Sequence, residues 1–413
     1  MRWPPGFMIY QRSLPASLGT VSKRTLSQAI PLLILWAAVA LPPPARAEPF
    51  ILYAGSYTSG TSKGIYAWRF DTDTGSLHPL GLEATTPQPA YVSASPDQRA
   101  LYAVNWEDQG GVSAFRIDPT TGGLTFLNRV SAEGSKPNQV VIHPSGRIAV
   151  SVNYTTGNVV AYKVRPDGSL TDAYWRDQHT GQPLSAQQPG PKAHGIVFSD
   201  DGRFMYIADL GLDRIYSYRV DADTGAITAG RPPYANTHPG AGPRRLQISS
   251  SGKFLYVDHE TDSEVSVFAA TGTRLKELQK VSTLPPAYTG PNTTAELVLS
   301  TDNRFLYVSN RGHDSIAVFS VTPATGRLVL ETNVPAGGHT PRNLRLDPTG
   351  GYLLSSNEDS GTITVFKVDK TTGHLTQSAS TAEINTPGSL CFVRVMAMSS
   401  NGRSDAQPGD RPR

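Results

Sequence analysis

One short phrase recurs along this chain of 413 residues. A turn rich in Pro, Ser, Asp and Gly is followed by an apolar run and then by Asn or a related polar residue. The copies are PFILYAGSY (49–57), SPDQRALYAVN (95–105), HPSGRIAVSVN (143–153), SDDGRFMYIAD (199–209), SSGKFLYVDH (250–259), STDNRFLYVSN (300–310) and DPTGGYLLSSN (347–357). Repetition at roughly fifty residues indicates an architecture in which each unit buries its core against its neighbours.

Each unit also contains other segments with the pattern of a β-strand. GIYAWRFD (64–71), GVSAFRID (111–118) and TITVFKVD (362–369) alternate apolar and polar residues and are rich in β-branched and aromatic side chains. A D-x-x-T-G turn often follows and leads into a further strand, and one more short strand precedes each phrase. Four short strands per unit are typical of a propeller blade. Gly 38 and Pro 33 fit the many turns that such a fold needs.

The two ends of the repeat region indicate how the ring closes. The first unit lacks a preceding strand, and the C-terminal segment GSLCFVRV (388–395) supplies one. We therefore predict an all-β fold, a seven-bladed β-propeller over 48–395, with the first blade closed by strands from both termini. This arrangement leaves no open edge. A pair of β-sandwiches explains neither the seven equal units nor the divided first unit.

The segments outside the repeats predict export. Residues 1–47 contain five basic and no acidic residues, an apolar run over 29–41, and the small-x-small sequence Ala45-Arg46-Ala47. We predict a signal peptide cleaved after Ala47, a periplasmic or secreted protein, and no stable membrane insertion after cleavage. An uncleaved anchor is the alternative, although 13 apolar residues are fewer than the ~20 of a membrane span. The polar segment 396–413 is predicted to be a disordered tail.

Charge and cysteine content exclude several classes of function. Without the leader, 37 − 5 = 32 basic residues stand against 34 acidic ones, a net charge of −2. The sequence therefore predicts no nucleic-acid partner. A single cysteine, Cys391, excludes an intramolecular disulfide and a CxxC metal site. We also find no His/Asp cluster with metal-ligand spacing, so we expect no metal and no cofactor.

Blade geometry identifies a candidate site. In each blade the start of the innermost strand and the end of the next strand lie at the same channel mouth, where ligand sites often form. Titratable residues at these positions concentrate in three consecutive units: His194, Arg244, Glu260 and Arg311. An imidazole or a carboxylate can move a proton, and two guanidinium groups can hold an anion or an oxyanion.

Three neighbours of this quartet, Arg245, His259 and Asn310, are expected to contact a substrate. A structural role is the alternative for all of these residues. Arg342 and Glu358 repeat the placement of Arg244 and Glu260 in another blade, which shows that such a pair also occurs as a simple salt bridge.

Longer phrases of the sequence are similar to a known family. AHGIVFSDDGRFMYIADLGLDRIYSYRVDADTG (193–225), GAGPRRLQISSSGKFLYV (240–257) and FLYVSNRGHDSIAVFSV (305–321) resemble the β-propeller lactonases, which include bacterial propeller-type 6-phosphogluconolactonases and fungal carboxy-muconate lactonizing enzymes. The resemblance covers 50–394. It implies a site of one His, two Arg and one Glu, which fall on His194, Arg244, Arg311 and Glu260.

The sequence departs from the family pattern around this site. Arg245 and Gln139 stand where the family usually has His. In the family's P-H-x-H phrase, Lys192 stands in place of the first His and His194 is the second. His259 stands where the family usually has Asn. At the channel mouth, Lys, Arg and amide side chains thus replace several of the family's histidines. They affect the expected substrate more than the expected reaction.

The resemblance implies an enzyme that hydrolyses a sugar-type lactone to its acid, without a metal. Its partner is then a small-molecule lactone. The family suggests 6-phosphogluconolactone, whereas the predicted export favours a lactone without phosphate. Two alternatives remain: a muconate-type cycloisomerase, and a non-catalytic binding propeller of the cell envelope whose mouth charges are all paired internally.

Overall fold

The computed structural model describes residues 50–396, and these form 28 β-strands. The predicted signal peptide (1–47) and almost all of the predicted tail (396–413) lie outside the described residues. No helix within 50–396 is long and apolar enough to cross a membrane.

The strands form seven four-stranded antiparallel sheets, which we number as blades 1 to 7. Blade 1 contains β28 (Pro387–Arg394), β1 (Phe50–Ser56), β2 (Gly64–Phe70) and β3 (Leu77–Thr85). Blade 2 contains β4 (Pro89–Ala94), β5 (Ala100–Asn105), β6 (Gly111–Ile117) and β7 (Leu124–Ser131), and blade 3 contains β8 (Pro137–Ile142), β9 (Ile148–Asn153), β10 (Asn158–Val164) and β11 (Leu170–Gln178). Blade 4 contains β12 (Ala193–Phe198), β13 (Phe204–Asp209), β14 (Arg214–Asp221) and β15 (Ala226–Asn236). Blade 5 contains β16 (Pro243–Ile248), β17 (Phe254–His259), β18 (Glu264–Thr271) and β19 (Arg274–Ser282). Blade 6 contains β20 (Thr293–Leu299), β21 (Phe305–Arg311), β22 (Ser315–Val321) and β23 (Leu328–Pro335), and blade 7 contains β24 (Pro341–Leu346), β25 (Tyr352–Asn357), β26 (Thr362–Val368) and β27 (Leu375–Glu383).

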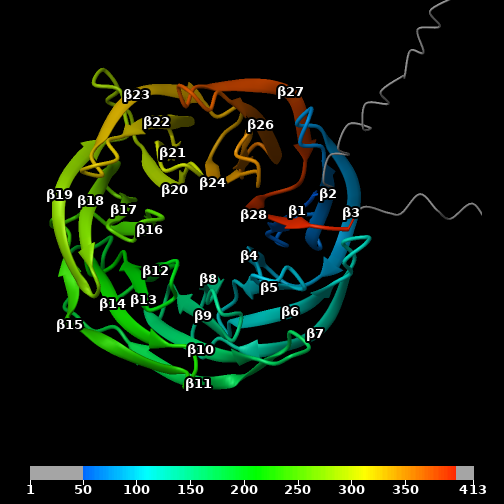
Figure 1. Cartoon of the computed structure of the whole chain (residues 1–413), viewed down its shortest axis with the longest axis horizontal. Coiled ribbons are helices and arrows are strands. Elements are labelled where there is room, and N and C mark those ends of the chain that lie inside the picture. Colours follow the sequence, from blue (N-terminus) through cyan, green and yellow to red (C-terminus); the bar gives the residue numbers. More distant parts are fainter. Residues whose placement is uncertain (1–49, 397–413) are drawn as a thin grey trace, which may run out of the picture. The chain divides into compact units, whose positions relative to one another are not determined.

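The first blade is completed by the end of the chain, as the sequence predicts. Strand β28 pairs antiparallel with β1, with Phe50 opposite Arg394 and Ala54 opposite Leu390. Figure 1 shows the red C-terminal strand beside the blue N-terminal one. The predicted seven-bladed ring and its closure are therefore confirmed.

The first strand of each blade lines the centre of the ring. Strands β28, β4, β8, β12, β16, β20 and β24 each contact the corresponding strand of the next blade, and the last contacts the first (Figure 1). The apolar clusters lie between adjacent blades: one joins Val265 and Val267 of blade 5 to Leu306 and Val308 of blade 6. Burial is thus shared around the ring, and no blade has a complete core alone.

A repeated tyrosine also joins neighbouring blades. The hydroxyl of Tyr307 in blade 6 donates a hydrogen bond to the Gly373 carbonyl in the β26–β27 turn of blade 7, at 3.1 Å. The same contact is made by Tyr53 to Gly122, Tyr102 to Gly168 and Tyr206 to Gly272. Burial raises the pKa of Tyr206 to about 12. These hydroxyls are therefore neutral donors that fix one blade against the next.

Candidate functional site

The structure brings the predicted quartet together at one end of the ring. His194 and Arg244 are the second residues of β12 and β16, Glu260 directly follows β17, and Arg311 ends β21. Because neighbouring strands are antiparallel, the start of a first strand and the end of a second strand meet at the same edge. Three consecutive blades therefore place an imidazole, a carboxylate and two guanidinium groups around one point.

Glu260 is the hub of this cluster. Its Oε2 atom lies 2.7 Å from Arg244 Nε, 3.1 Å from Arg311 Nη2 and 4.0 Å from His194 Nε2. The Glu260 and Arg311 side chains are 24% and 15% exposed, whereas those of His194 and Arg244 are 4% and 2% exposed. A molecule that enters from solvent therefore meets the carboxylate and Arg311 first, with His194 and Arg244 behind them.

The two arginines keep Glu260 ionised. Burial alone would raise the pKa of this carboxyl, but Arg244 and Arg311 outweigh burial and hold the pKa below its ordinary value. Burial, together with the charge of Arg244, lowers the pKa of Arg311 to about 10, which leaves it protonated at neutral pH. Two cations thus share one carboxylate. The cluster therefore has a net positive charge, which favours an anionic ligand or an oxyanion.

His194 is held neutral in this environment. Burial and the charges of Arg244 and Arg245 lower its pKa well below 6.5. The amide nitrogen of Asn138 lies 2.7 Å from Nδ1, and the ring of Tyr154 packs edge-on at 5.7 Å between centroids. A neutral imidazole beside an ionised carboxylate can donate or accept a proton, depending on its tautomer.

Two donors of the quartet have no partner among the described residues. Arg244 Nη1 and Arg311 Nε are buried and make no hydrogen bond. Arg311 is otherwise held by its Nη2 atom, which donates to the Thr294 carbonyl at 2.7 Å. Unpaired N–H groups of charged side chains are unfavourable, so an acceptor that reached them would be bound favourably.

Arg245 lies away from the quartet, in the middle of the ring. Its guanidinium stacks on Tyr91 of blade 2 at 4.7 Å, its Nε atom lies 3.6 Å from Glu296 Oε2 of blade 6, and its Nη1 atom donates to the His194 carbonyl at 3.4 Å. Gly195 makes room for this arrangement, because a Cβ atom there would lie 2.3 Å from the Arg244 carbonyl oxygen. Arg245 is thus engaged with other blades, and its contact with substrate stays a prediction.

Further polar side chains extend these contacts around the axis. Gln139 of blade 3 donates to the Tyr91 hydroxyl at 3.0 Å, Asn343 of blade 7 donates to Glu296 at 2.6 Å, and Leu390 N of blade 1 donates to Asn343 Oδ1 at 3.0 Å. We call Tyr91, Gln139, Arg245, Glu296 and Asn343 the central layer. It links all seven blades beneath the quartet.

Asn310 and His259 are not brought to the mouth. Asn310 is fully buried, and its amide bonds to Ser315 of its own blade and to Thr283, which directly follows the last strand of blade 5. These bonds give Asn310 a structural role, and its contact with substrate stays a prediction. His259 is also fully buried, and its ring lies beside Asp262. Successive residues of a strand point to opposite faces, which explains why these two side chains miss the mouth.

Further residues around the site were not predicted to belong to it. Glu296 and Asn138 each stand at the start of an innermost strand, so their position was an available indication of their place near the axis. The Arg342–Glu358 pair, at 3.1 Å, lies beside the quartet and is completed by the Tyr57 hydroxyl, which accepts from Arg342 at 2.6 Å. The sequence could not show that this tyrosine completes the pair, because it comes from a distant segment.

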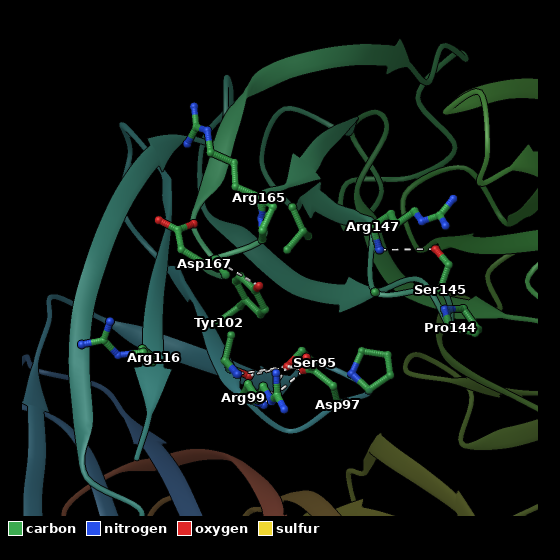
Figure 2. A pocket seen from close by; sticks show the side chains of 16 residues that line it. Ser95, Asp97, Arg99, Tyr102, Arg116, Pro144, Ser145, Arg147, Arg165 and Asp167 are labelled. Carbon is green, nitrogen blue, oxygen red and sulfur yellow. Dashed lines mark hydrogen bonds between the residues drawn. The ribbon is translucent and has the colours of Figure 1, made fainter. Parts of the chain in front are cut away.

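A separate cavity of about 720 Å³ lies at the opposite end of the strands, between blades 2 and 3 (Figure 2). Its lining includes Arg99, Arg147, Arg165 and Asp167, and none of the quartet. Two of its arginines are engaged: Arg147 pairs with Asp223, and Arg165 bonds to the Leu170 carbonyl. The concentration of buried and charged groups at the quartet makes that end the candidate active site.

Comparison with known proteins agrees with this geometry. The family described as "Lactonase, 7-bladed beta-propeller" matches residues 51–393. The chain belongs to this family. It is 36% identical over 306 residues to a 6-phosphogluconolactonase of Bacillus subtilis, covering 73% of this chain and 86% of that protein.

Solved structures of relatives of this lactonase-family chain show the same fold. A periplasmic gluconolactonase of Pseudomonas aeruginosa is 33% identical, with a TM-score of 0.80 over 84% of this chain and 100% of that one. A putative 6-phosphogluconolactonase of Bacteroides fragilis is 32% identical, with a TM-score of 0.79 over 85% of this chain and 99% of that one.

Proposed function

We propose that this protein hydrolyses a non-phosphorylated sugar lactone to the corresponding acid in the periplasm or outside the cell. The observation that carries the reaction is the hub at Glu260, where an ionised carboxylate is shared by two arginines beside a neutral imidazole. The predicted leader supports the absence of phosphate, because a phosphorylated sugar lactone is not expected outside the cytoplasm. The P. aeruginosa relative is described as a periplasmic gluconolactonase, which supports the same choice.

Each member of the quartet has a part in the proposed reaction. Glu260, the more exposed of the two proton-transfer groups, takes a proton from the attacking water. Arg311 and Arg244 hold the carbonyl oxygen as it becomes an oxyanion. The tetrahedral intermediate then collapses, the ring C–O bond breaks, and His194 donates a proton to the departing alkoxide. In the same step His194 takes up the proton that Glu260 removed from water, since the two side chains lie 4.0 Å apart, so the ring stays neutral and the product is an open-chain hydroxy acid.

The test is a panel of lactones with purified protein, followed by proton release in a weakly buffered indicator solution. Glucono-, galactono- and 6-phosphoglucono-lactone are each corrected for spontaneous hydrolysis. We expect turnover of the first two to exceed that of the phosphorylated lactone. Faster turnover of the phosphorylated lactone would refute the choice of substrate but keep the reaction.

Variants then test the site. Glu260→Gln and His194→Ala are each expected to lower kcat/KM by about 10²-fold or more, the usual effect of losing a proton-transfer group. Glu358→Gln is the matched control, since it removes the carboxylate at the equivalent place of blade 7. Wild-type rates in both site variants, or equal losses in the control, would refute the assigned roles. Absence of turnover on every lactone by folded protein would favour the cycloisomerase or the binding propeller.

A further inference from the structure

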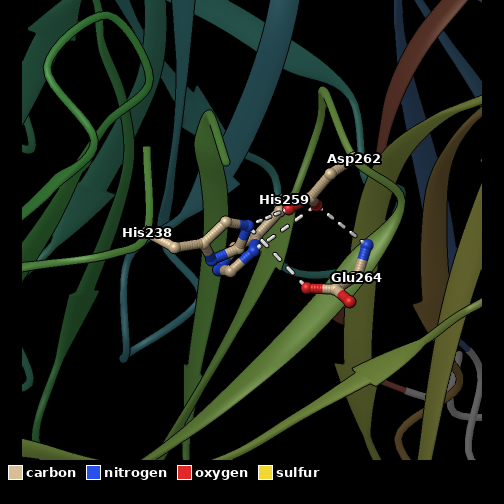
Figure 3. Close-up of side chains that lie close together, drawn as sticks. All are labelled: His238, His259, Asp262 and Glu264. Atoms are coloured by element: carbon tan, nitrogen blue, oxygen red, sulfur yellow. Dashed lines mark hydrogen bonds and ion pairs between the residues drawn. The ribbon is translucent and has the colours of Figure 1, made fainter. Parts of the chain in front are cut away.

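Four side chains of metal-binding type meet beside the quartet, contrary to the expectation from sequence. His238 lies in the connection between β15 and β16, His259 ends β17, Asp262 lies in the β17–β18 turn, and Glu264 begins β18. One ligand atom from each lies within 4.8 Å of the others. Figure 3 shows the four side chains directed toward one another. The spacing of these residues in the sequence does not predict the cluster, because His238 reaches it only when the β15–β16 connection folds over the β17–β18 turn.

His259 supplies an independent indication of a ligand. Its side chain is fully buried, and neither ring nitrogen has a hydrogen-bond partner within 50–396. Its Nδ1 atom lies 3.5 Å from Asp262 Oδ1, beyond hydrogen-bond distance for this pair. A buried imidazole normally bonds through at least one nitrogen, so this ring is arranged for a partner other than protein.

The spacing of the ligand atoms suits a small divalent ion. Ligands at 2.0–2.2 Å from a tetrahedral Zn²⁺ ion lie roughly 3.3–3.6 Å from one another. The His259–Asp262 separation of 3.5 Å falls in this range, whereas His238 Nε2 lies 3.8 Å from Glu264 Oε2 and the four ligand atoms lie within 4.8 Å of one another, so the side chains would draw closer around an ion. His238 and Asp262 are in direct hydrogen-bond contact, and this contact would open slightly around an ion.

We propose that His238, His259, Asp262 and Glu264 bind one divalent transition-metal ion of the Zn²⁺ class. Two neutral imidazoles and two carboxylates balance the charge of such an ion, and imidazole favours Zn²⁺ over Mg²⁺ or Ca²⁺. The ion fastens the β15–β16 connection to the β17–β18 turn. Because His259 directly precedes Glu260, the ion also fixes the strand end that presents this carboxylate. It is a positioning ion and is not placed in the reaction.

Lys280 is the competitor for this site. Its Nζ atom lies 3.3 Å from Glu264 Oε2, and its side chain is 38% exposed. A cation already attracted to the cluster indicates its negative potential. The exposed lysine can turn into solvent when an ion binds, so its removal is expected to strengthen binding.

The experiment is a titration of untagged protein, first dialysed against a chelator, with Zn²⁺ in a calorimeter. We expect one equivalent to bind and the thermal unfolding midpoint to rise, whereas Mg²⁺ leaves the midpoint unchanged. Co²⁺ in place of Zn²⁺ should give the visible absorption bands of tetrahedral coordination. Failure of wild-type protein to bind one equivalent of Zn²⁺ or Co²⁺ would overturn the proposal.

Variants assign the ligands. His238→Ala, whose side chain is partly exposed, and the near-isosteric Asp262→Asn are each expected to weaken Zn²⁺ binding at least tenfold, and Lys280→Met is expected to strengthen it. His339→Ala is the control, because His339 pairs with Asp314 at 2.7 Å in a similar histidine–aspartate contact. Unchanged binding in both ligand variants, or an equal loss in the control, would refute the assignment. Metal binding and thermal unfolding do not depend on turnover. They therefore test the metal site whether or not the protein is a lactonase.

Discussion

Replacing Arg245 by Met should destabilise the protein more than most single substitutions. The side chain lies nearly buried in the central layer, 3.6 Å from the nearly buried carboxylate of Glu296. Methionine fills a similar volume but leaves the Glu296 carboxylate without a counter-charge, held only by hydrogen bonds from Asn343 and from the Leu297 N–H. At an effective dielectric constant of ~20, two unit charges at this distance attract by about 4–5 kcal/mol. Removing one partner of a buried pair commonly costs about 3–5 kcal/mol, so we expect a loss in this range.

The loss should depend on pH. Burial already raises the pKa of Glu296 above 4.5, and Arg245 opposes this effect. Without Arg245 the pKa in the folded protein rises further, so between pH 4.5 and that higher value the folded state holds a proton that the unfolded state has released. Stability of Arg245→Met therefore falls as pH increases through this interval. The variant should be closest to wild type in mild acid and furthest from it at pH 8.

Equilibrium unfolding in urea at several pH values measures this effect. The double variant Arg245→Met, Glu296→Gln removes both charges and keeps an acceptor for Asn343, so it should recover most of the lost stability. The reasoning would be refuted if the single variant lost less than about 1 kcal/mol at pH 8. It would also be refuted if the two substitutions were simply additive.

Three further outcomes are expected. Tyr307→Phe removes one interblade hydrogen bond and should lower the free energy of unfolding by about 0.5–1.5 kcal/mol in urea titrations; an unchanged value would mean that this bond adds nothing. A chain that ends at residue 386 lacks β28 and should lose the cooperative unfolding transition in calorimetry, whereas a cooperative transition near that of the full chain would show that closure is dispensable. Because the pKa of His194 lies well below 6.5 and that of Glu260 below 4.5, kcat/KM for lactone should stay level from pH 8 to pH 6, and a fall centred near 6.5 would contradict this environment.

The fold was predictable because its information is local and repeated. The period of about fifty residues defines the blades, and strand alternation defines their faces. The aligned tyrosines Tyr102 and Tyr307 prove to be more than apolar core residues, since each hydroxyl reaches a turn 66 residues further along the chain. The spacing of the repeats does not predict this hydrogen bond between blades.

The site was predictable only as far as strand ends determine it. His194 and Glu260 follow from blade geometry, because strand ends share an edge. Which way a side chain turns there depends on twist and local bulges: the register of β16 against β17 shifts between Pro243 and Leu246, the stretch that carries Arg244 and Arg245. These neighbours consequently diverge, one toward Glu260 and the other toward the axis. From the sequence, both were expected at the mouth, Arg244 in the quartet and Arg245 as a neighbour in contact with substrate.

The union of β1 with β28 also has a consequence for biosynthesis. Strand β1 ends at Ser56, and the strand that covers its inner edge begins at Pro387. At ~5–20 residues per second, a ribosome needs roughly 20–70 s to make the intervening chain. Throughout that time the nascent polypeptide carries a long apolar strand with one edge unpaired, which is a template for association with other chains. The last segment translated therefore ends the period of greatest risk, and protection during that period has to come from chaperones or from holding the chain unfolded.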